Sequence, residues 1–358
     1  MVMLVSGLAL AIGSVGVFLC VDGSAGGAPT TRPADRFLHD FASNDGKHPN
    51  GLDDRADDTA AMRKALSAGP GVVRIGPGFY RFGEVTVPEG VTVQGSGPGT
   101  VVRGGGFKQI FRQEKVAHWA IRDLVLDGEA PGNWKGRKDE GRSGILCEGC
   151  SHFEIVGVTV RNVNGAGIQL LRIGGAGEGW GSGSNLHRIT AVGNYAGVRF
   201  DFRAEYINAS QLSCQNNVVG CIVHAGNAKI TCSNFTSNLD GLVIEDKENG
   251  SHGVIADCLV NHNDRYALLG RGIRNGMVVS NCCFFCGTIR LEDCVGVGIT
   301  SGIINAAMEI TGTGTNRIAG NYIIPAELGF EFSPATLVRD NFTDQGPWDR
   351  NTMTERGD

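Results

Sequence analysis

Four ionisable residues recur at nearly regular intervals in the middle of the chain. Each directly follows a four-residue segment rich in apolar side chains, and the intervals between them are 23, 21 and 26 residues. They are Asp201, His224, Glu245 and Arg271. Carboxylates placed close to a histidine and an arginine shift one another's pKa values and can transfer protons. If the fold brings them together, they predict acid–base chemistry of the kind that acts on a glycosidic bond or a uronate C5 proton.

The segments before these residues belong to a repeat. Their first residues are spaced by 30, 23, 21, 26, 21, 19 and 22. The segments are 167–170, 197–200, 220–223, 241–244, 267–270, 288–291, 307–310 and 329–332. A period near 22 with very short strands is typical of a solenoid. The consensus and helical return of leucine-rich repeats are absent, and propeller blades need about twice this period. A parallel β-helix therefore fits best.

Glycine and asparagine supply the tight corners that such coils need. The chain has 55 glycines in 358 residues, and an asparagine usually precedes each segment. These asparagines are Asn162, Asn194, Asn216, Asn238 and Asn263. Both residue types tolerate positive φ, and amides stacked on successive coils can pair with one another.

Strand alternation predicts two outward-facing columns on this face. Side chains alternate between the two faces of a strand, and stacked coils lie about 4.8 Å apart. One column contains Asp201, His224, Glu245, Arg271 and Glu292, and the parallel column contains Gln169, Arg199, Ile222, Val243, Leu269, Arg290 and Glu309. We expect the first to hold the acid–base groups, and Arg199, Arg290 and Glu292 to contact substrate. The alternative is a solvated polar surface, on which these arginines neutralise carboxylates of neighbouring coils.

Two longer insertions could form walls beside these columns. Residues 129–142 include Trp134, and residues 174–184 include Trp180. Exposed tryptophans on loops suit stacking on sugar rings, so both are candidate substrate-binding residues. The alternative is that each tryptophan packs its own loop onto the coils.

The N-terminal region resembles a known module. Asp57-Asp58-Thr59 can begin a helix through Leu66, residues 71–80 form a Gly-rich strand ending in Pro-Gly-Phe-Tyr, and residues 91–97 form a strand closing in Gly-Ser-Gly. This order resembles the start of pectate-lyase superfamily proteins, specifically the pectate lyase 3-like module. The resemblance to right-handed parallel β-helix proteins covers roughly residues 37–343. It implies an all-β right-handed parallel β-helix whose short N-terminal helix caps the open end, and it implies polysaccharide as the substrate class.

The known active-site patterns of related families are incomplete here. Asn238-Leu-Asp240-Gly241 resembles the Asn-Thr-Asp-Gly segment of polygalacturonase-like hydrolases, but the partner motifs on the next coils are missing. The Asp-Pro-His-Glu run of alginate epimerases is absent, and so is a convincing Arg-x-Pro-x-x-Arg of pectate lyases. The resemblance is therefore specific for fold and weak for reaction.

Composition limits the compartment and the partners. Residues 1–28 read as a signal peptide or anchor, 29–36 as a linker, 37–343 as the β-helix domain and 344–358 as a polar tail. We therefore expect a secreted or cell-envelope protein, with a membrane partner only if residues 1–21 are retained. A formal net charge of -5 does not indicate a nucleic-acid-binding surface, and no nucleotide-binding motif is present.

The cysteines indicate neither a clear metal site nor a clear set of disulfides. Of eleven, Cys232, Cys258 and Cys282 fall where neighbouring repeats carry apolar residues, so buried thiols explain most of them. The pairs at 147/150 and 282/286 could be metal ligands, but they lack zinc-site spacing. Sequence requires no cofactor, and calcium stays possible with Asp201 or Glu245 as a ligand.

Three functions follow from these patterns. We expect a lyase or epimerase acting on an acidic, uronate-containing polysaccharide, with His224 as the base and Arg271 or Arg199 neutralising the substrate carboxylate. The first alternative is a non-catalytic glycan-binding or structural surface protein. The second is a glycoside hydrolase of the polygalacturonase-like type.

Overall fold

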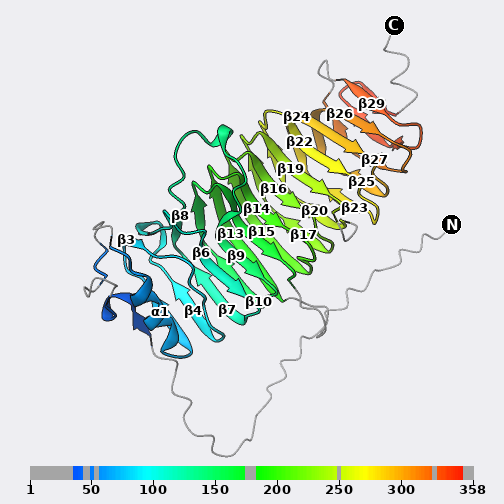
Figure 1. Ribbon diagram of the computed structural model, residues 1–358. Coiled ribbons are helices and arrows are strands. Elements are labelled where there is room, and N and C mark those ends of the chain that lie inside the picture. The colour runs from blue at the N-terminus through cyan, green and yellow to red at the C-terminus, as the bar shows by residue number, and fades with distance from the viewer. Residues whose placement is uncertain are drawn as a thin grey trace, which may run out of the picture. The chain divides into compact units, whose positions relative to one another are not determined.

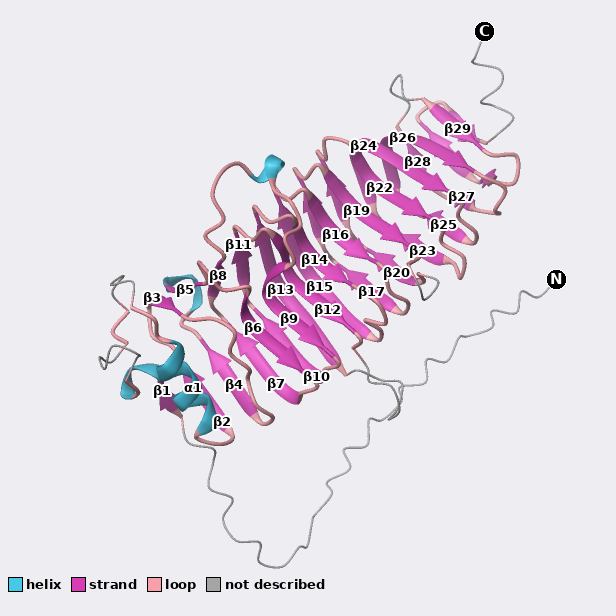
Figure 2. Cartoon of the chain, viewed as in Figure 1, coloured by secondary structure: helices cyan, strands magenta, loops and turns pink. Residues whose placement is uncertain are grey.

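Very short strands joined by tight corners wind into a right-handed parallel β-helix of about eleven turns (Figure 1). This computed structural model describes residues 35–42, 49–51, 56–173, 183–247, 251–324 and 329–349. Most turns contribute one strand to each of three parallel sheets. The strands of successive turns pair with one another, so each sheet runs along the solenoid (Figure 2). The fold predicted from the repeat is confirmed.

The first and second sheets face away from the predicted columns. The first sheet contains β1 (Arg36–Phe37), β2 (Gly71–Arg74), β4 (Val91–Gln94), β7 (Ala117–Arg122), β10 (Ser151–Val156), β17 (Ala228–Thr231), β20 (Gly253–Ala256), β23 (Met277–Ser280), β25 (Val297–Thr300), β27 (Arg317–Ala319) and β30 (Leu337–Arg339). The second contains β3 (Gly78–Arg81), β5 (Thr100–Arg103), β8 (Val125–Asp127), β11 (Thr159–Arg161), β18 (Asn234–Thr236), β21 (Leu259–Asn261), β28 (Tyr322–Ile323) and β31 (Asn341–Thr343). Two long strands, β13 (Ser184–Val192) and β15 (Ile207–Gln215), bend from the first sheet into the second.

The third sheet carries the predicted columns. Its strands are β6 (Gln109–Glu114), β9 (Arg142–Glu148), β12 (Gly165–Leu171), β14 (Ala196–Phe200), β16 (Val219–Val223), β19 (Asp240–Glu245), β22 (Tyr266–Arg271) and β29 (Phe330–Phe332). The long strands β24 (Cys283–Glu292) and β26 (Ile303–Thr311) enter it from the second sheet.

Parallel stacking ends where the chain turns back on itself. Strand β32 (Gly346–Trp348) pairs antiparallel with β31, and the Trp348 side chain is buried. The described part of the predicted polar tail, residues 344–349, therefore contains a short hairpin strand. Because its Trp348 side chain is buried, this strand packs onto the β-helix domain.

Stacked apolar side chains and a buried asparagine ladder hold successive coils together. Phe200, Phe235 and Phe284 are fully buried inside the solenoid. Beside them runs the ladder, made of Asn194, Asn217, Asn238 and Asn263. At each step an asparagine Oδ1 accepts hydrogen bonds from the previous asparagine's backbone N–H and Nδ2, at 2.9–3.1 Å.

Two of the predicted asparagines lie at positive-φ corners, as expected, and are not members of the buried ladder. Asn217, rather than Asn216, is the buried member, because Asn216 occupies the corner before it with φ 52°. Asn162 occupies the equivalent corner two coils earlier with φ 56°, where Val163 takes the ladder position. Asparagine thus serves two purposes in one turn, which spacing alone does not separate.

Helix α1 (Thr59–Ser67) lies at the N-terminal end of the stack (Figure 1). Its Met62, Ala65 and Leu66 side chains are buried, as the helical spacing predicts. The Asp57 carboxylate accepts a hydrogen bond from the Thr59 N–H at 2.9 Å, whereas Asp58 accepts one from the Arg81 N–H at 3.0 Å. Asp58 therefore ties the helix to the first coils. Single 3-10 turns occur at Leu38–Asp40 (η1), Gly97–Gly99 (η2) and Trp134–Gly136 (η3).

The thiols described by the structure are free. Seven of these ten cysteines are buried, including Cys258 and Cys282, as expected for small apolar side chains. Cys232 differs from the prediction, because it is exposed at a corner with φ 50°.

The predicted signal or anchor, residues 1–28, lies outside the described residues, as does most of the 29–36 linker. Among the residues with described structure, no helix has both the length and the apolar character needed to cross a membrane.

Candidate functional site

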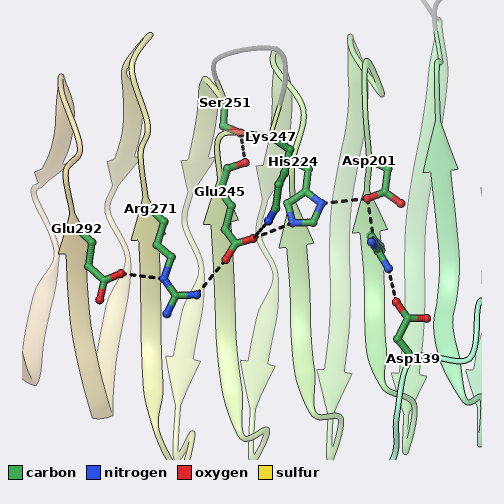
Figure 3. A network of polar contacts seen from close by, with 9 residues as sticks. Asp139, Asp201, His224, Glu245, Lys247, Ser251, Arg271 and Glu292 are labelled. Atoms are coloured by element: carbon green, nitrogen blue, oxygen red, sulfur yellow. Dashed lines mark hydrogen bonds and ion pairs between the residues drawn. The ribbon is translucent and has the colours of Figure 1, made fainter.

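The outer face of the third sheet brings the predicted ionisable column together (Figure 3). Strand pairing places Glu245 beside Arg271 and Arg271 beside Glu292. Phe200, Val223 and Ile244 pair with one another on consecutive strands. The residues that directly follow them, Asp201, His224 and Glu245, therefore lie on consecutive coils in the same way. Residues far apart in sequence thus become direct neighbours.

His224 lies between two carboxylates. Its Nδ1 is 3.0 Å from Asp201 Oδ1, and its Nε2 is 3.4 Å from Glu245 Oε2. All three side chains are largely buried, with exposed fractions of 12%, 11% and 17% for His224, Asp201 and Glu245. When Nδ1–H donates to Asp201, Nε2 presents a lone pair that can accept a proton, as in other aspartate-oriented histidines.

Asp201 has two further side-chain partners besides His224. It also accepts hydrogen bonds from Arg199 Nε at 2.8 Å and from Gln169 Nε2 at 2.7 Å. Burial alone would raise the pKa of Asp201, but the hydrogen bond from His224 and the charge of Arg199 outweigh it and lower the pKa. Asp201 is therefore ionised at neutral pH and fixes both the histidine and the arginine.

Glu245 is held in the same charge state. Its burial would raise the pKa, but hydrogen bonds from Lys247 and Arg271 lower it below the ordinary value. The distances are 3.0 Å from Lys247 Nζ to Oε2 and 3.0 Å from Arg271 Nη1 to Oε1. Lys247 lies two residues beyond Glu245, just past the end of β19, so only its closeness in sequence could have identified it.

The column continues as a row of ion pairs towards the C-terminus. Arg271 Nε is 2.8 Å from Glu292 Oε2, and Arg290 Nε is 2.6 Å from Glu292 Oε1. Arg290 Nη1 in turn lies 3.0 Å from Glu309 Oε2. The predicted substrate-binding residues Arg290 and Glu292 are thus on the same face, and they are paired with each other.

An apolar strip runs beside the column. Ile222, Val243 and Leu269 are neighbours on consecutive strands and face outward, yet only 6%, 8% and 3% of their surface is exposed. Arg199 precedes this strip and Arg290 follows it in the register. The second predicted column is therefore apolar in its middle, with one arginine on each side of the apolar strip.

The first insertion reaches this face from the coil of β8. Buried Arg137 anchors it by donating to Ala130 O at 3.1 Å and Asn164 Oδ1 at 3.2 Å. Beyond this anchor, Asp139 Oδ2 lies 2.6 Å from Arg199 Nη1, and Lys135 Nζ lies 2.5 Å from Asp264 Oδ2. The insertion therefore spans several coils of the third sheet.

The structure places one of the two predicted tryptophans. Trp134 is half-buried in η3, with the Lys135 Nζ 5.4 Å from the ring centroid. Trp180 lies outside the described residues. The role of each in sugar binding stays a prediction.

Besides Lys247, sequence reasoning did not single out two other residues that contact or adjoin the column. Asp139 belongs to the insertion, and no repeat position marks it. Tyr195 packs against the apolar strip, and burial, then the nearby charge of Asp139, raise its pKa. The contact of Asp139 depends on where the insertion crosses the coils, which the repeat does not specify, whereas Tyr195 directly precedes β14.

The column does not fit a calcium ion. In the described parts of the chain, no group of three or more histidine, cysteine, aspartate or glutamate side chains is arranged to hold a metal. Asp201 and Glu245, the predicted ligands, direct their oxygens to His224, Arg199 and Arg271 instead.

Comparison with known proteins shows the fold and leaves the family open. The sequence matches no protein-family model and no curated protein sequence. The A-module of mannuronan C-5 epimerase AlgE4 from Azotobacter vinelandii is 16% identical, with a TM-score of 0.56 over 84% of this chain and 99% of that one. A GH87 α-1,3-glucanase catalytic unit from Streptomyces thermodiastaticus is 15% identical (TM-score 0.54, covering 92% and 72%). A tailspike of E. coli bacteriophage HK620, in complex with a pentasaccharide, is 14% identical (TM-score 0.61, covering 88% and 66%). The pectate-lyase resemblance itself stays a prediction.

Proposed function

We propose that this protein acts on polysaccharides through proton transfer at the column, with His224 as the proton-transferring group. The observation that carries the proposal is the clamping of His224 between Asp201 and Glu245. The named activities of structural neighbours support the substrate class, because an epimerase, a glucanase and a saccharide-bound tailspike share this fold.

Within this class, lyase or epimerase chemistry on a uronate-containing glycan is favoured. Both reactions begin when a base removes the C5 proton next to a carboxylate, and a cation must neutralise that carboxylate. His224 is the base, and Arg199 or Arg271 is the neutralising cation. Asp201 orients the imidazole through Nδ1, and the Glu245 carboxylate, 3.4 Å from Nε2, accepts a hydrogen bond from that nitrogen once it carries the abstracted proton.

The charge state of the carboxyl groups disfavours the hydrolase alternative. A glycosidase needs one carboxylic acid with a raised pKa to protonate the leaving group. The pKa values of Asp201, Glu245 and Glu292 are all lowered, because neighbouring cations or hydrogen bonds outweigh burial. None of these three is then available as a general acid at neutral pH.

A panel of uronate and neutral polymers tests the proposal. We expect absorbance from unsaturated products, or a changed uronate composition without cleavage, on at least one uronate polymer. H224A should abolish it. New reducing ends without unsaturation would indicate hydrolysis and contradict the proposed reaction class.

One observation favours a second candidate, a non-catalytic glycan-binding or structural protein. Within the two columns as the structure describes them, the charged side chains from Arg199 to Glu309 pair with neighbours, so these ion pairs also join successive coils. Glycan binding without any change to the polymer, unaffected by H224A, would establish this candidate.

A further inference from the structure

We propose that Arg199 is the subsite for a glycan carboxylate, and that Asp139 occupies this subsite until substrate displaces it. The inference rests on the proposed function, because it assigns the acidic group of that substrate to one residue. It also gives the 129–142 insertion a role in specificity.

Arg199 is already engaged in the way a carboxylate-binding arginine must be. Its Nε donates to Asp201 Oδ1 at 2.8 Å, which fixes the plane of the guanidinium. Its Nη1 donates to Asp139 Oδ2 at 2.6 Å. Because the guanidinium fork is rigid and matches carboxylate geometry, the Asp139 carboxylate marks where a substrate carboxylate would bind.

The two carboxylates on Arg199 differ in how firmly they are held. The Asp201 side chain is 11% exposed and is also fixed by His224 and Gln169, whereas the Asp139 side chain is 34% exposed. Exposed ion pairs contribute little to stability, so competing carboxylates can replace them. Asp139 is therefore the displaceable partner.

The insertion can release Asp139 without losing its own anchor. Arg137 holds the base of the insertion through Ala130 and Asn164, away from the column. The second tether, Lys135 to Asp264, joins two exposed side chains. Displacement of Asp139 thus requires a local shift of the insertion and leaves the coils intact.

The position of Arg199 suits the proposed chemistry. Asp201 contacts both Arg199 and His224 Nδ1, so a carboxylate at Arg199 lies next to the proton-transferring group. The acidic C5 proton of a uronate is on the carbon that bears the carboxylate. The neighbouring side chain of Ile222 is apolar, and less water beside the guanidinium strengthens its attraction for an anion.

Calorimetric titration with oligogalacturonate and oligomannuronate tests the inference. For any oligouronate that binds, D139N should bind up to about fivefold more tightly, because a competing exposed pair is removed. R199Q should bind at least about tenfold more weakly. R199K keeps the charge and lacks the fork, so it should also bind more weakly, and thermal unfolding verifies that both arginine variants are folded.

Two variants of the same insertion and its tether serve as matched controls. E140Q removes the same charge one residue away, and D264N releases the Lys135 tether without touching Arg199. Both should bind like the wild type. Equal gains in D139N and E140Q would mean a general charge effect, and equal gains in D139N and D264N would mean simple loop opening; either result overturns the role of Asp139.

Failure of this inference can be told apart from failure of the proposed function. If wild type and R199Q bind and convert a uronate polymer equally, the Arg199 subsite is wrong and the function stands. If no oligouronate binds any variant, the acidic substrate class and the subsite both fall.

Discussion

Replacing Asp201 with asparagine tests whether the column is an electrostatic unit. Asp201 accepts hydrogen bonds from His224, Arg199 and Gln169, and hydrogen bonds to a charged group contribute about 1.5–3 kcal/mol each. Asparagine keeps the size and one acceptor but loses the charge. We expect D201N to lower the free energy of unfolding by about 2–3 kcal/mol at pH 7.

The loss should depend on pH in one direction. The folded state lowers the pKa of Asp201 below its unfolded value of about 3.9, so its contribution is complete above about pH 5. It is lost as pH falls through the folded-state pKa. Glu245 and Glu292 shift in the same direction, but they are present in both proteins and cancel in the difference.

Urea unfolding of wild type and D201N between pH 7 and pH 3 measures this effect. The difference in unfolding free energy should shrink as pH falls below about 4, because Asp201 of the unfolded wild type is then protonated and folding must release that proton. D344N, an exposed aspartate outside the column, should stay within about 0.5 kcal/mol at every pH. A D201N difference that is small at pH 7, or constant with pH, would refute the reasoning.

Three further predictions concern the coils and the column. N217A should lower the unfolding free energy by about 2–4 kcal/mol because it leaves buried ladder groups unpaired, whereas N216G at a positive-φ corner should change it by less than about 0.5 kcal/mol; chemical denaturation compares them. F235A should cost about 3–5 kcal/mol through the cavity it leaves, seen as a lower midpoint in thermal unfolding, and a loss below about 1 kcal/mol would contradict the stacked core. K247A removes an exposed partner of Glu245 and should cost less than about 1 kcal/mol, with a difference that disappears in high salt; a difference that persists in salt would exclude a simple surface pair.

The coil architecture was predictable because one physical constraint repeats. Every turn must bury apolar side chains on the inside, so the alternation around Val198 and Phe200 fixes the direction of Arg199 and Asp201 as well. The same register, carried from coil to coil, is enough to place Asp201 beside His224. This is why the order of residues along the column could be predicted from the repeat alone.

The contacts made by the insertions were not predictable in the same way. Asp139 reaches Arg199 from a loop whose path is set by the anchoring of Arg137, and no periodicity encodes that path. The one-residue shift from Asn216 to Asn217 has a similar origin. Both positions in the corner accept asparagine, and only the backbone conformation decides which one is buried.

Loss of the uronate C5 proton tests the central claim most directly. An epimerase replaces this proton with solvent deuterium and a lyase leaves a C4=C5 double bond, so NMR of oligouronates incubated with the protein in D2O detects loss of the C5–H signal in either reaction. We predict this loss with wild type and with H262N, an exposed histidine that follows β21 of the second sheet, and a rate at least about a hundredfold lower in H224A. Loss at an unchanged rate in H224A, or no loss with any oligouronate, would contradict proton transfer by His224.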